Sequence, residues 1–291
     1  MNKKKIYPWY FVAGAFLLVA ALYLAPALLG IGYSFTDWSR YSQTVHFVGF
    51  KNYSKAFSGS ERYLFYIRNT LLFTVASSVL KLTLGLALAL LFTGKKIWLP
   101  NLHRAVAFAP QVFSVLIIGI TFQALLHPSH GFFNIFLKSI GLGVLAHNWL
   151  GDTATAFGAV IAVDVWRGAG YAMVIFIAGI QNIPAVYYEA ASIDGAGFWK
   201  KLGCITIPCL LPTLTVNLVL SLTYGLRVFD IVYALTNGGP GDATDVINTA
   251  VFQNFSKGNY AMGTTLSSIL AVFTLILAYF IIRRMGRSEE A

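Results

Sequence analysis

Five ionisable side chains interrupt long apolar stretches of this chain: Lys81, Asp164, Arg167, Arg227 and Asp230. A charge at the centre of a bilayer costs about 2.5–3.5 kcal/mol on insertion scales, so such residues usually face a cavity or an opposite charge. Asp164 and Arg167 are three residues apart, and so are Arg227 and Asp230, which places each pair on one face of a helix. If those two faces meet, the four charges form an alternating cluster.

Two interpretations of these charges stay open from the sequence. In the first, they line a polar path for a substrate, together with neighbouring polar and aromatic side chains. In the second, they lock helices together as ion pairs or extend to the membrane interface. Arg227 and Asp230 lie near the end of their apolar stretch, which favours a gate or a loop anchor for that pair. Lys81 has no partner at helical spacing, and the sequence assigns it no role.

The residues that usually carry catalysis are not organised into a site. The histidines are scattered, and His127 and His130 have a three-residue spacing without a nearby acidic or cysteine partner. Cys204 and Cys209 are one isolated pair, which is neither a disulfide framework nor a metal site. The segment 94–96 lacks the upstream glycine and the hydroxyl of a phosphate-binding loop. We therefore expect no enzyme activity, no metal site and no ATP hydrolysis by this chain.

The composition is that of a membrane protein. Of 291 residues, 57% are hydrophobic and 11% are charged, whereas a soluble domain carries roughly 25% charged residues. The formal net charge of +10 is not accompanied by a basic helix or an RNA-binding signature, so we expect no nucleic-acid partner. A lipid bilayer explains both features, because cytoplasmic loops of membrane proteins accumulate Lys and Arg.

Six apolar stretches are long enough to cross the hydrocarbon core as helices, which needs about 20 residues each. The first runs too far to be a cleaved signal segment. Pro26, Pro110 and Pro212 fall inside stretches, where they either bend the bundle or expose carbonyls to a cavity. We expect an all-α protein with six transmembrane helices at roughly 9–35, 69–93, 105–126, 154–180, 206–229 and 262–282.

Basic residues predict the orientation of these spans. They are densest close to the span ends on one side, which the positive-inside rule places in the cytoplasm. Both termini and the segment 181–208 then lie in the cytoplasm, and the loops 36–68, 127–153 and 230–261 lie outside. The basic residues on the cytoplasmic side are Lys3, Lys4, Lys5, Lys95, Lys96, Arg104, Lys200, Lys201, Arg283, Arg284 and Arg287.

A polar island at 189–208 separates the fourth and fifth spans. Pro184 is placed to start a short helix, and Gly195 supplies a turn that a side chain would obstruct. A second arm follows with the apolar side chains Phe198, Trp199 and Leu202, which are anchors of the kind used in helix-in-groove docking. The island reads Glu-Ala-Ala, three residues, Gly, nine residues, Ile, one residue, an aliphatic residue, Pro.

This pattern resembles the coupling loop, or EAA motif, of ABC import permeases. The chain is similar to the maltose-type permeases of carbohydrate importers over nearly its whole length, and specifically to the first of the two subunits that pair in them. One departure is Ile207, where the family usually has Leu. The other matching segments are 47–53, Asn69-Thr70, 127–134, Trp149-Leu150, 165–168, Phe229-Asp230 and the turn at 235–241.

The resemblance implies a type I importer permease fold in a bacterial cytoplasmic membrane. It implies a second homologous permease subunit, two ATPase subunits that bind ATP and Mg, an extracytoplasmic solute-binding protein and a sugar substrate. The implied ATPase-coupling residues are Glu189, Ala190, Ala191, Asp194, Gly195, Ile205 and Pro208. The implied substrate-path residues are Gln111, Asp164, Arg167, Gly168, Tyr171, Tyr224, Gly225, Arg227, Val228 and Asp230.

We therefore expect one half of the translocation path for a sugar, most simply an oligosaccharide. We expect an N-terminal span with its first external loop at 1–68, a core permease domain at 69–284 that contains the coupling loop 181–208, and a cytoplasmic tail at 285–291. The surplus of Arg leaves open an acidic or phosphorylated substrate, such as a uronate oligosaccharide or glycerol phosphate. An ion-driven secondary carrier is a distant alternative, because its inverted repeats are not found.

Overall fold

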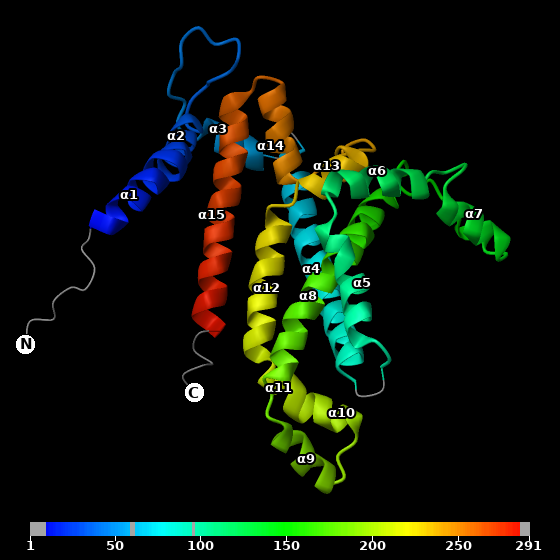
Figure 1. The fold of residues 1–291 in the computed structure, drawn as a ribbon. Helices are drawn as coiled ribbons and strands as arrows, with labels where there is room; N and C mark the ends of the chain where they lie inside the picture. The colour runs from blue at the N-terminus through cyan, green and yellow to red at the C-terminus, as the bar shows by residue number, and fades with distance from the viewer. Residues whose placement is uncertain (1–9, 59–61, 95–96, 286–291) are drawn as a thin grey trace, which may run out of the picture. The chain divides into compact units, whose positions relative to one another are not determined.

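The computed structural model describes residues 10–58, 62–94 and 97–285 (Figure 1). The described part is helical, and its one isolated bridge joins Thr36 and Phe47. The chain divides into two compact units, residues 1–64 with 250–272 and residues 65–249 with 273–291. Several residues used above lie outside the described part, namely Lys3, Lys4, Lys5, Lys95, Lys96, Arg287 and the remainder of 286–291.

Four of the six expected spans are helices that are long and apolar enough to cross a membrane. The first is a continuous helix formed by three consecutive segments, α1 (Tyr10–Val19), the π-helical η1 (Ala20–Leu24) and α2 (Ala25–Tyr33). The other three are α4 (Tyr63–Thr93), α8 (Ala156–Gln181) and α15 (Tyr260–Met285).

The remaining two expected spans are bent helix pairs, in stretches where Pro110 and Pro212 had indicated bending. Helices α5 (Pro100–Val112) and α6 (Val115–Leu125) meet at 97°. The break lies at Phe113, whose backbone is extended, three residues after Pro110 of α5. The segment Phe198–Cys209 meets α12 (Leu211–Leu226) at 68°. Pro212 lies in the first turn of α12, where a missing N–H breaks no helical hydrogen bond.

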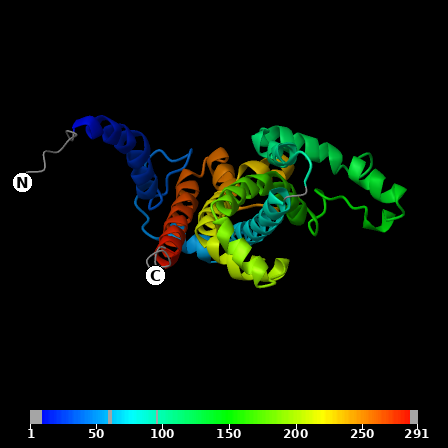
Figure 2. The same ribbon diagram turned by 60° about the horizontal axis from the view of Figure 1, so that its bottom comes forward.

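Within the second unit, α4, α5, α8 and α12 lie side by side (Figures 1 and 2). Helix α8 packs closely against α5, and a Cβ at Gly170 would overlap the carbonyl of Ala107 on α5. Apolar side chains fill the space between these helices, including Met173 and Phe176 of α8 and Leu210, all of them buried. Glycine is needed at 170 because the two backbones approach so closely.

At one end of this helix group, α6 packs against α13 (Asp230–Thr236). A Cβ at Gly119 would lie only 2.5 Å from that of Ala234. The side-chain amide of Gln123 donates to the carbonyls of Ala234 and Leu235 at 2.9 and 3.1 Å. Val228 lies in the apolar core beside this contact. The loop to α13 is therefore held rigidly at this end of the group.

The turn after α13 is fixed by hydrogen bonds from α4. Asn237 and Gly238 have positive φ, as the turn signal at 235–241 requires. The Asn69 amide donates to the carbonyls of Ala243 and Asp245 at 3.1 and 3.0 Å. The backbone N–H of Ile247, which begins α14 (Ile247–Ser256), donates to the hydroxyl of Thr70. The Asn69-Thr70 pair thus positions a loop more than 170 residues away in the sequence.

Two other loops are held by buried or half-buried polar side chains. In the second unit, Asn134 of α7 (Phe132–Ser139) receives a hydrogen bond from the Trp149 indole at 2.7 Å, and η2 (Gly143–Leu145) lies between them in sequence. In the first unit, Asn52 of α3 (Lys51–Phe57) donates to the carbonyls of Ser34 and Thr36. These contacts give structural roles to two of the segments that carry the family resemblance.

Candidate functional site

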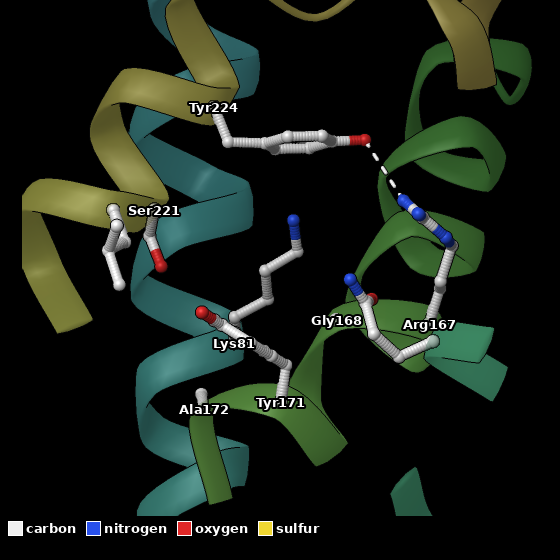
Figure 3. A pocket seen from close by; sticks show the side chains of 9 residues that line it. Lys81, Arg167, Gly168, Tyr171, Ala172, Ser221 and Tyr224 are labelled. Atoms are coloured by element: carbon white, nitrogen blue, oxygen red, sulfur yellow. Dashed lines mark hydrogen bonds between the residues drawn. The ribbon is translucent and has the colours of Figure 1, made fainter. Parts of the chain in front are cut away.

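A polar cavity of about 220 Å³ lies among α4, α5, α8 and α12 (Figure 3). Seven of its nine lining residues come from α8 and α12, which are adjacent helices. The cavity therefore lies inside the group of apolar helices. The hydrogen bonds that water would otherwise make to a polar ligand have to come from side chains there. Its lining consists of Lys81, Gln111, Arg167, Gly168, Tyr171, Ala172, Leu220, Ser221 and Tyr224.

A buried ion pair forms one wall of the cavity. The Lys81 ammonium lies 2.6 Å from Oδ2 of Asp164, which also accepts a hydrogen bond from Ser77 at 2.5 Å. Lys81 is 6% exposed and Asp164 is fully buried. Because removing one charge from a buried pair leaves the other uncompensated, each partner requires the other. Asp164 thus holds the Lys81 head group beside the cavity.

The path of the Lys81 side chain explains Gly168. A Cβ at Gly168 would lie 2.5 and 2.9 Å from two carbons of the Lys81 stem. The ammonium continues toward Tyr224 and lies 4.5 Å from the centre of its ring, which is cation–π range (Figure 3). Glycine at 168 therefore makes room for Lys81 to cross α8 and reach the cavity.

Arg167 occupies the other side of the cavity. Its Nη1 donates to the hydroxyl of Tyr224 at 3.3 Å, as the dashed line in Figure 3 marks. Its Nε is buried without a hydrogen-bond partner, and the ion pairs formed within the described residues do not include it. The guanidinium is positioned by α8 and Tyr224, and its remaining donors are unused.

The structure brings together five of the ten residues expected along the substrate path: Gln111, Arg167, Gly168, Tyr171 and Tyr224. Asp164 lies behind Lys81 and does not line the cavity. Val228 is buried in the apolar core, and Gly225 packs against Thr74 of α4. Arg227 and Asp230 are exposed and lie outside the cavity lining.

The alternating cluster of four charges does not form. Asp164 is paired with Lys81 of α4, a residue that had no assigned role, and not with Arg227. The sequence did contain a signal for this pair, since Lys81 and Asp164 are opposite charges in two apolar stretches. Helical spacing identifies partners only within one helix, so a pair between α4 and α8 was missed. Ser77 and Ser221 were missed because isolated serines are common in membrane helices.

The polar island forms a helix–turn–helix, which we call the coupling element, residues 185–209. It consists of α9 (Ala185–Ile193), α10 (Phe198–Lys201), the π-helical η3 (Leu202–Thr206) and α11 (Ile207–Cys209). Pro184 caps the start of α9. Gly195 has φ of +71°, the left-handed conformation that favours glycine, and the N–H of Ala196 donates to the carbonyl of Ala191.

Side-chain hydrogen bonds join the two arms of the coupling element. The Lys201 ammonium donates to the Ser192 hydroxyl at 2.7 Å. The hydroxyls of Tyr188 and Thr206 lie 3.0 Å apart. These two links, with the turn at Gly195, make the element one small body.

The coupling element presents much of its surface to solvent. Glu189, Ala190, Asp194, Gly195 and Pro208 are exposed, whereas Ala191 and Ile205 are half-buried. Phe198 and Trp199 are 61% and 80% exposed, and with Leu202 they line an apolar groove of about 1030 Å³ against α4. Ile193, which the sequence did not single out, is 88% exposed at the end of α9.

The position of the element in the chain links it to the cavity. It begins just after α8 and ends just before α12, and Figure 1 shows α9, α10 and α11 together at one end of the helix group. Those two helices supply most of the cavity lining. A displacement of the coupling element therefore acts directly on α8 and α12, the two helices that supply most of the cavity lining.

The described residues contain no group of three or more His, Cys, Asp or Glu side chains that could hold a metal ion. His127 and His130 stack with ring centres 3.5 Å apart. Cys204 and Cys209 are free thiols in the coupling element. The chemistry that the described side chains offer is recognition by hydrogen bonds, charge and aromatic faces.

Comparison with known proteins gives relatives over almost the whole chain. The probable ABC transporter permease protein YurN of Bacillus subtilis is 34% identical over 96% of this chain and 95% of its own length. The trehalose/maltose transport system permease protein MalF of Thermococcus litoralis is 36% identical over 83% of this chain and 80% of its own. Among solved structures, a chain of a bacterial ABC transporter for import of the acidic polysaccharide alginate has a TM-score of 0.77, 26% identity, and coverage of 96% and 98%.

The family model described as the inner membrane component of binding-protein-dependent transport systems matches residues 81–287. That range contains the cavity residues, the coupling element, the long apolar helices α8 and α15 and both bent helix pairs. With the relatives above, this match identifies an integral membrane permease of the ABC type. The chain belongs to the family of inner membrane components of binding-protein-dependent transport systems.

Proposed function

We propose that this chain is the permease subunit of an ATP-driven sugar importer. The observation that carries the proposal is that one exposed helix–turn–helix joins the two helices that line a polar cavity. Relatives named for trehalose/maltose and for alginate support a saccharide as the substrate, and they include both neutral and acidic sugars. The hydroxyls and ring faces of Tyr171 and Tyr224 suit a polyhydroxylated ligand.

In the proposed assembly, the chain pairs with a second, homologous permease subunit. Two separate ATPase subunits bind ATP and Mg in the cytoplasm, because this sequence lacks a phosphate-binding loop. A solute-binding protein delivers the sugar from the other side. A solved transporter related to this chain is described in complex with a saccharide-bound periplasmic protein, which supports such a partner here.

The proposed mechanism is alternating access driven by the coupling element. Closure of the ATPases on ATP displaces the element, in which Glu189 and Gly195 are central to the contact. Since the two arms are joined by Lys201–Ser192 and Tyr188–Thr206, the element moves as a unit. It then shifts α8 and α12, and the 68° bend before α12 provides a joint for that movement.

This mechanism requires the coupling element and both termini to be in the cytoplasm. Cysteine labelling tests the orientation with the native thiols Cys204 and Cys209, which are exposed. In intact cells an impermeant maleimide should leave them unmodified, and in inside-out vesicles it should modify them. Modification in intact cells would exclude the proposed role of the element.

Copurification separates this proposal from an ion-driven carrier. A tagged chain expressed with its genomic neighbours should retain an ATPase and a second permease after purification in mild detergent. Proteoliposomes containing that complex and the solute-binding protein should accumulate a saccharide only when ATP is supplied to the cytoplasmic side. Uptake driven by a proton or sodium gradient without ATP would contradict the proposal.

A further inference from the structure

The cavity between the helices carries an unbalanced positive charge. Two charged residues line it, Lys81 and Arg167, and Lys81 is paired at 2.6 Å with Asp164, which lies behind it. The pair is internally neutral, and the guanidinium of Arg167 forms no ion pair of its own among the described residues. Between apolar helices the dielectric is lower than in bulk water, so such a charge acts strongly on a ligand there.

The guanidinium is also short of acceptors. Its Nη1 uses the Tyr224 hydroxyl at a long 3.3 Å, and its buried Nε has no partner. A buried donor without an acceptor carries a desolvation penalty, which a ligand oxygen removes. The neutral acceptors in the lining are the side chains of Gln111, Ser221, Tyr171 and Tyr224, and none of them balances the charge.

We propose that this cavity binds an anionic sugar unit, with Arg167 as the group that selects a carboxylate. The proposal rests on the proposed function and specifies its substrate class. A guanidinium offers parallel donors that match the two oxygens of a carboxylate, a fit that a single ammonium lacks. The Lys81 ammonium, paired with Asp164, lies under the Tyr224 ring, and Arg167 donates to the hydroxyl of the same tyrosine (Figure 3).

The size of the cavity indicates how much of the substrate it holds. Its volume of about 220 Å³ is below the ~300–1,000 Å³ of typical ligand pockets. It therefore accommodates one unit of a saccharide chain, and the remaining units lie against other surfaces. The charge requirement then applies to that one unit, which is a uronic acid in a carboxylated saccharide.

The test compares two probes that differ in charge and little in shape. They are a trigalacturonate and its methyl ester, offered to the purified transporter complex with its solute-binding protein in proteoliposomes. Because the binding protein also selects its ligand, the informative quantity is the ratio of acid to ester uptake in a variant, divided by the same ratio in the wild type. The binding protein is identical in both, so its preference cancels.

The variant Arg167→Gln keeps the hydrogen-bonding capacity and loses the charge. We expect its relative acid-to-ester uptake ratio to fall about tenfold, because the variant loses one charge-assisted contact that contributes ~1.5 kcal/mol or more. Arg167→Lys retains the charge but lacks the parallel donors of a guanidinium, so its acid-to-ester uptake ratio should fall by a smaller factor. The matched control Lys138→Gln removes a positive charge from the exposed surface of α7 and should leave the ratio unchanged.

Each outcome decides the inference. Equal losses of acid and ester uptake in Arg167→Gln would overturn it, because Arg167 would then serve hydroxyls or structure. Wild-type uptake of the ester or another neutral saccharide alone would overturn it and leave the sugar-import proposal standing. Uptake of a hexose phosphate without the trigalacturonate would overturn the carboxylate assignment. ATP-dependent uptake of no saccharide would instead reject the proposed function itself.

Discussion

The coupling element and the cavity are built in opposite ways. The coupling element is a contiguous segment of 25 residues, 185–209, whose turn, caps and arms all follow from neighbouring positions. The cavity gathers residues from four helices, and its central ion pair joins Lys81 to a residue 83 positions away in the sequence. The first region is exposed on the surface, whereas the second lies between apolar helices and has buried charged residues, Lys81 and Asp164, at one wall.

This difference has consequences for mutation. A substitution in the exposed element should affect contacts with a partner and leave the fold intact. A substitution at the buried ion pair should lower the free energy of unfolding before it changes recognition. The two regions can therefore be separated by measuring abundance or stability alongside uptake, and the following variants do so in order of expected effect.

The largest effect is expected for Gly195→Asp. It places a carboxylate on the surface that we propose contacts the ATPase, where an unpaired interfacial charge costs several kcal/mol, so uptake should fall ~100-fold or more. No atom lies within 4 Å of a Cβ at this position, so the protein should reach the membrane in normal amounts. Gly195→Asn, which also tolerates positive φ, is the matched control and should lose less uptake.

Uptake and membrane abundance are measured together for both Gly195 variants. Normal uptake by Gly195→Asp would exclude the coupling role. If membrane abundance fell as much as uptake, the loss would come from folding, and the expected difference between the coupling element and the cavity would be contradicted.

The next largest effect is expected for Asp164→Asn, on stability. It leaves the Lys81 charge buried without its partner, which should lower the free energy of unfolding by ~3–5 kcal/mol. The isosteric control Asp152→Asn, at an exposed loop position, should change it by less than about 0.5 kcal/mol. Unfolding in detergent, followed by denaturant titration, measures both.

The double variant Lys81→Met with Asp164→Leu sharpens this second test. Replacing both charges with apolar groups removes the uncompensated charge and should recover most of the lost stability. Recovery of stability without recovery of uptake would assign the ion pair to recognition. If the double variant is as unstable as Asp164→Asn, the uncompensated charge of Lys81 does not cause the lower free energy of unfolding.

A smaller effect is expected for Trp199→Ala, on assembly. The indole is 80% exposed beside an apolar groove, and an aromatic anchor at an interface contributes about 2 kcal/mol or more. Binding of the ATPase to the permease should weaken by at least ~10-fold, as measured by surface-immobilised association assays. Trp98→Ala removes an equally exposed indole outside the groove and should change binding little. Equal losses of ATPase binding in Trp199→Ala and Trp98→Ala would show that the position of the indole in the coupling element does not matter for docking.

The smallest effect is expected for Ser192→Ala. It removes the link from Lys201 to α9, an exposed hydrogen bond that contributes about 0.5–1.5 kcal/mol. Uptake should fall less than about twofold, because the Tyr188–Thr206 contact still joins the arms. Complete loss of uptake would mean that rigidity of the element depends on this one contact.

The sequence predicted the elements that depend on neighbours along the chain. The apolar stretches predicted the crossings, and the Glu-Ala-Ala and Gly195 pattern predicted the two arms and their turn. Pro110 and Pro212 indicated bending in two of these stretches, but the positions and angles of the breaks were not predicted. Hydropathy does not distinguish a straight helix from a bent pair, and the chain breaks at Phe113, three residues after Pro110.

The charged residues show the limit of spacing arguments. Helical spacing correctly placed Asp164 and Arg167 on one helix, but their partners come from α4 and α12. Arg227 and Asp230 share the same spacing and lie outside the cavity lining. Identical local patterns therefore received different environments, because the helix packing and not the spacing decides which face is enclosed.

By itself, the sequence determined a helical membrane protein with a helix–turn–helix of defined shape, because hydropathy, capping and the glycine turn act between residues close in the chain. Only the tertiary structure decided that Lys81 pairs with Asp164, that Gly168 admits the lysine stem, and that the Nε of Arg167 is buried without a partner. Those outcomes depend on distances between separate helices, and a one-dimensional pattern carries no information about such distances.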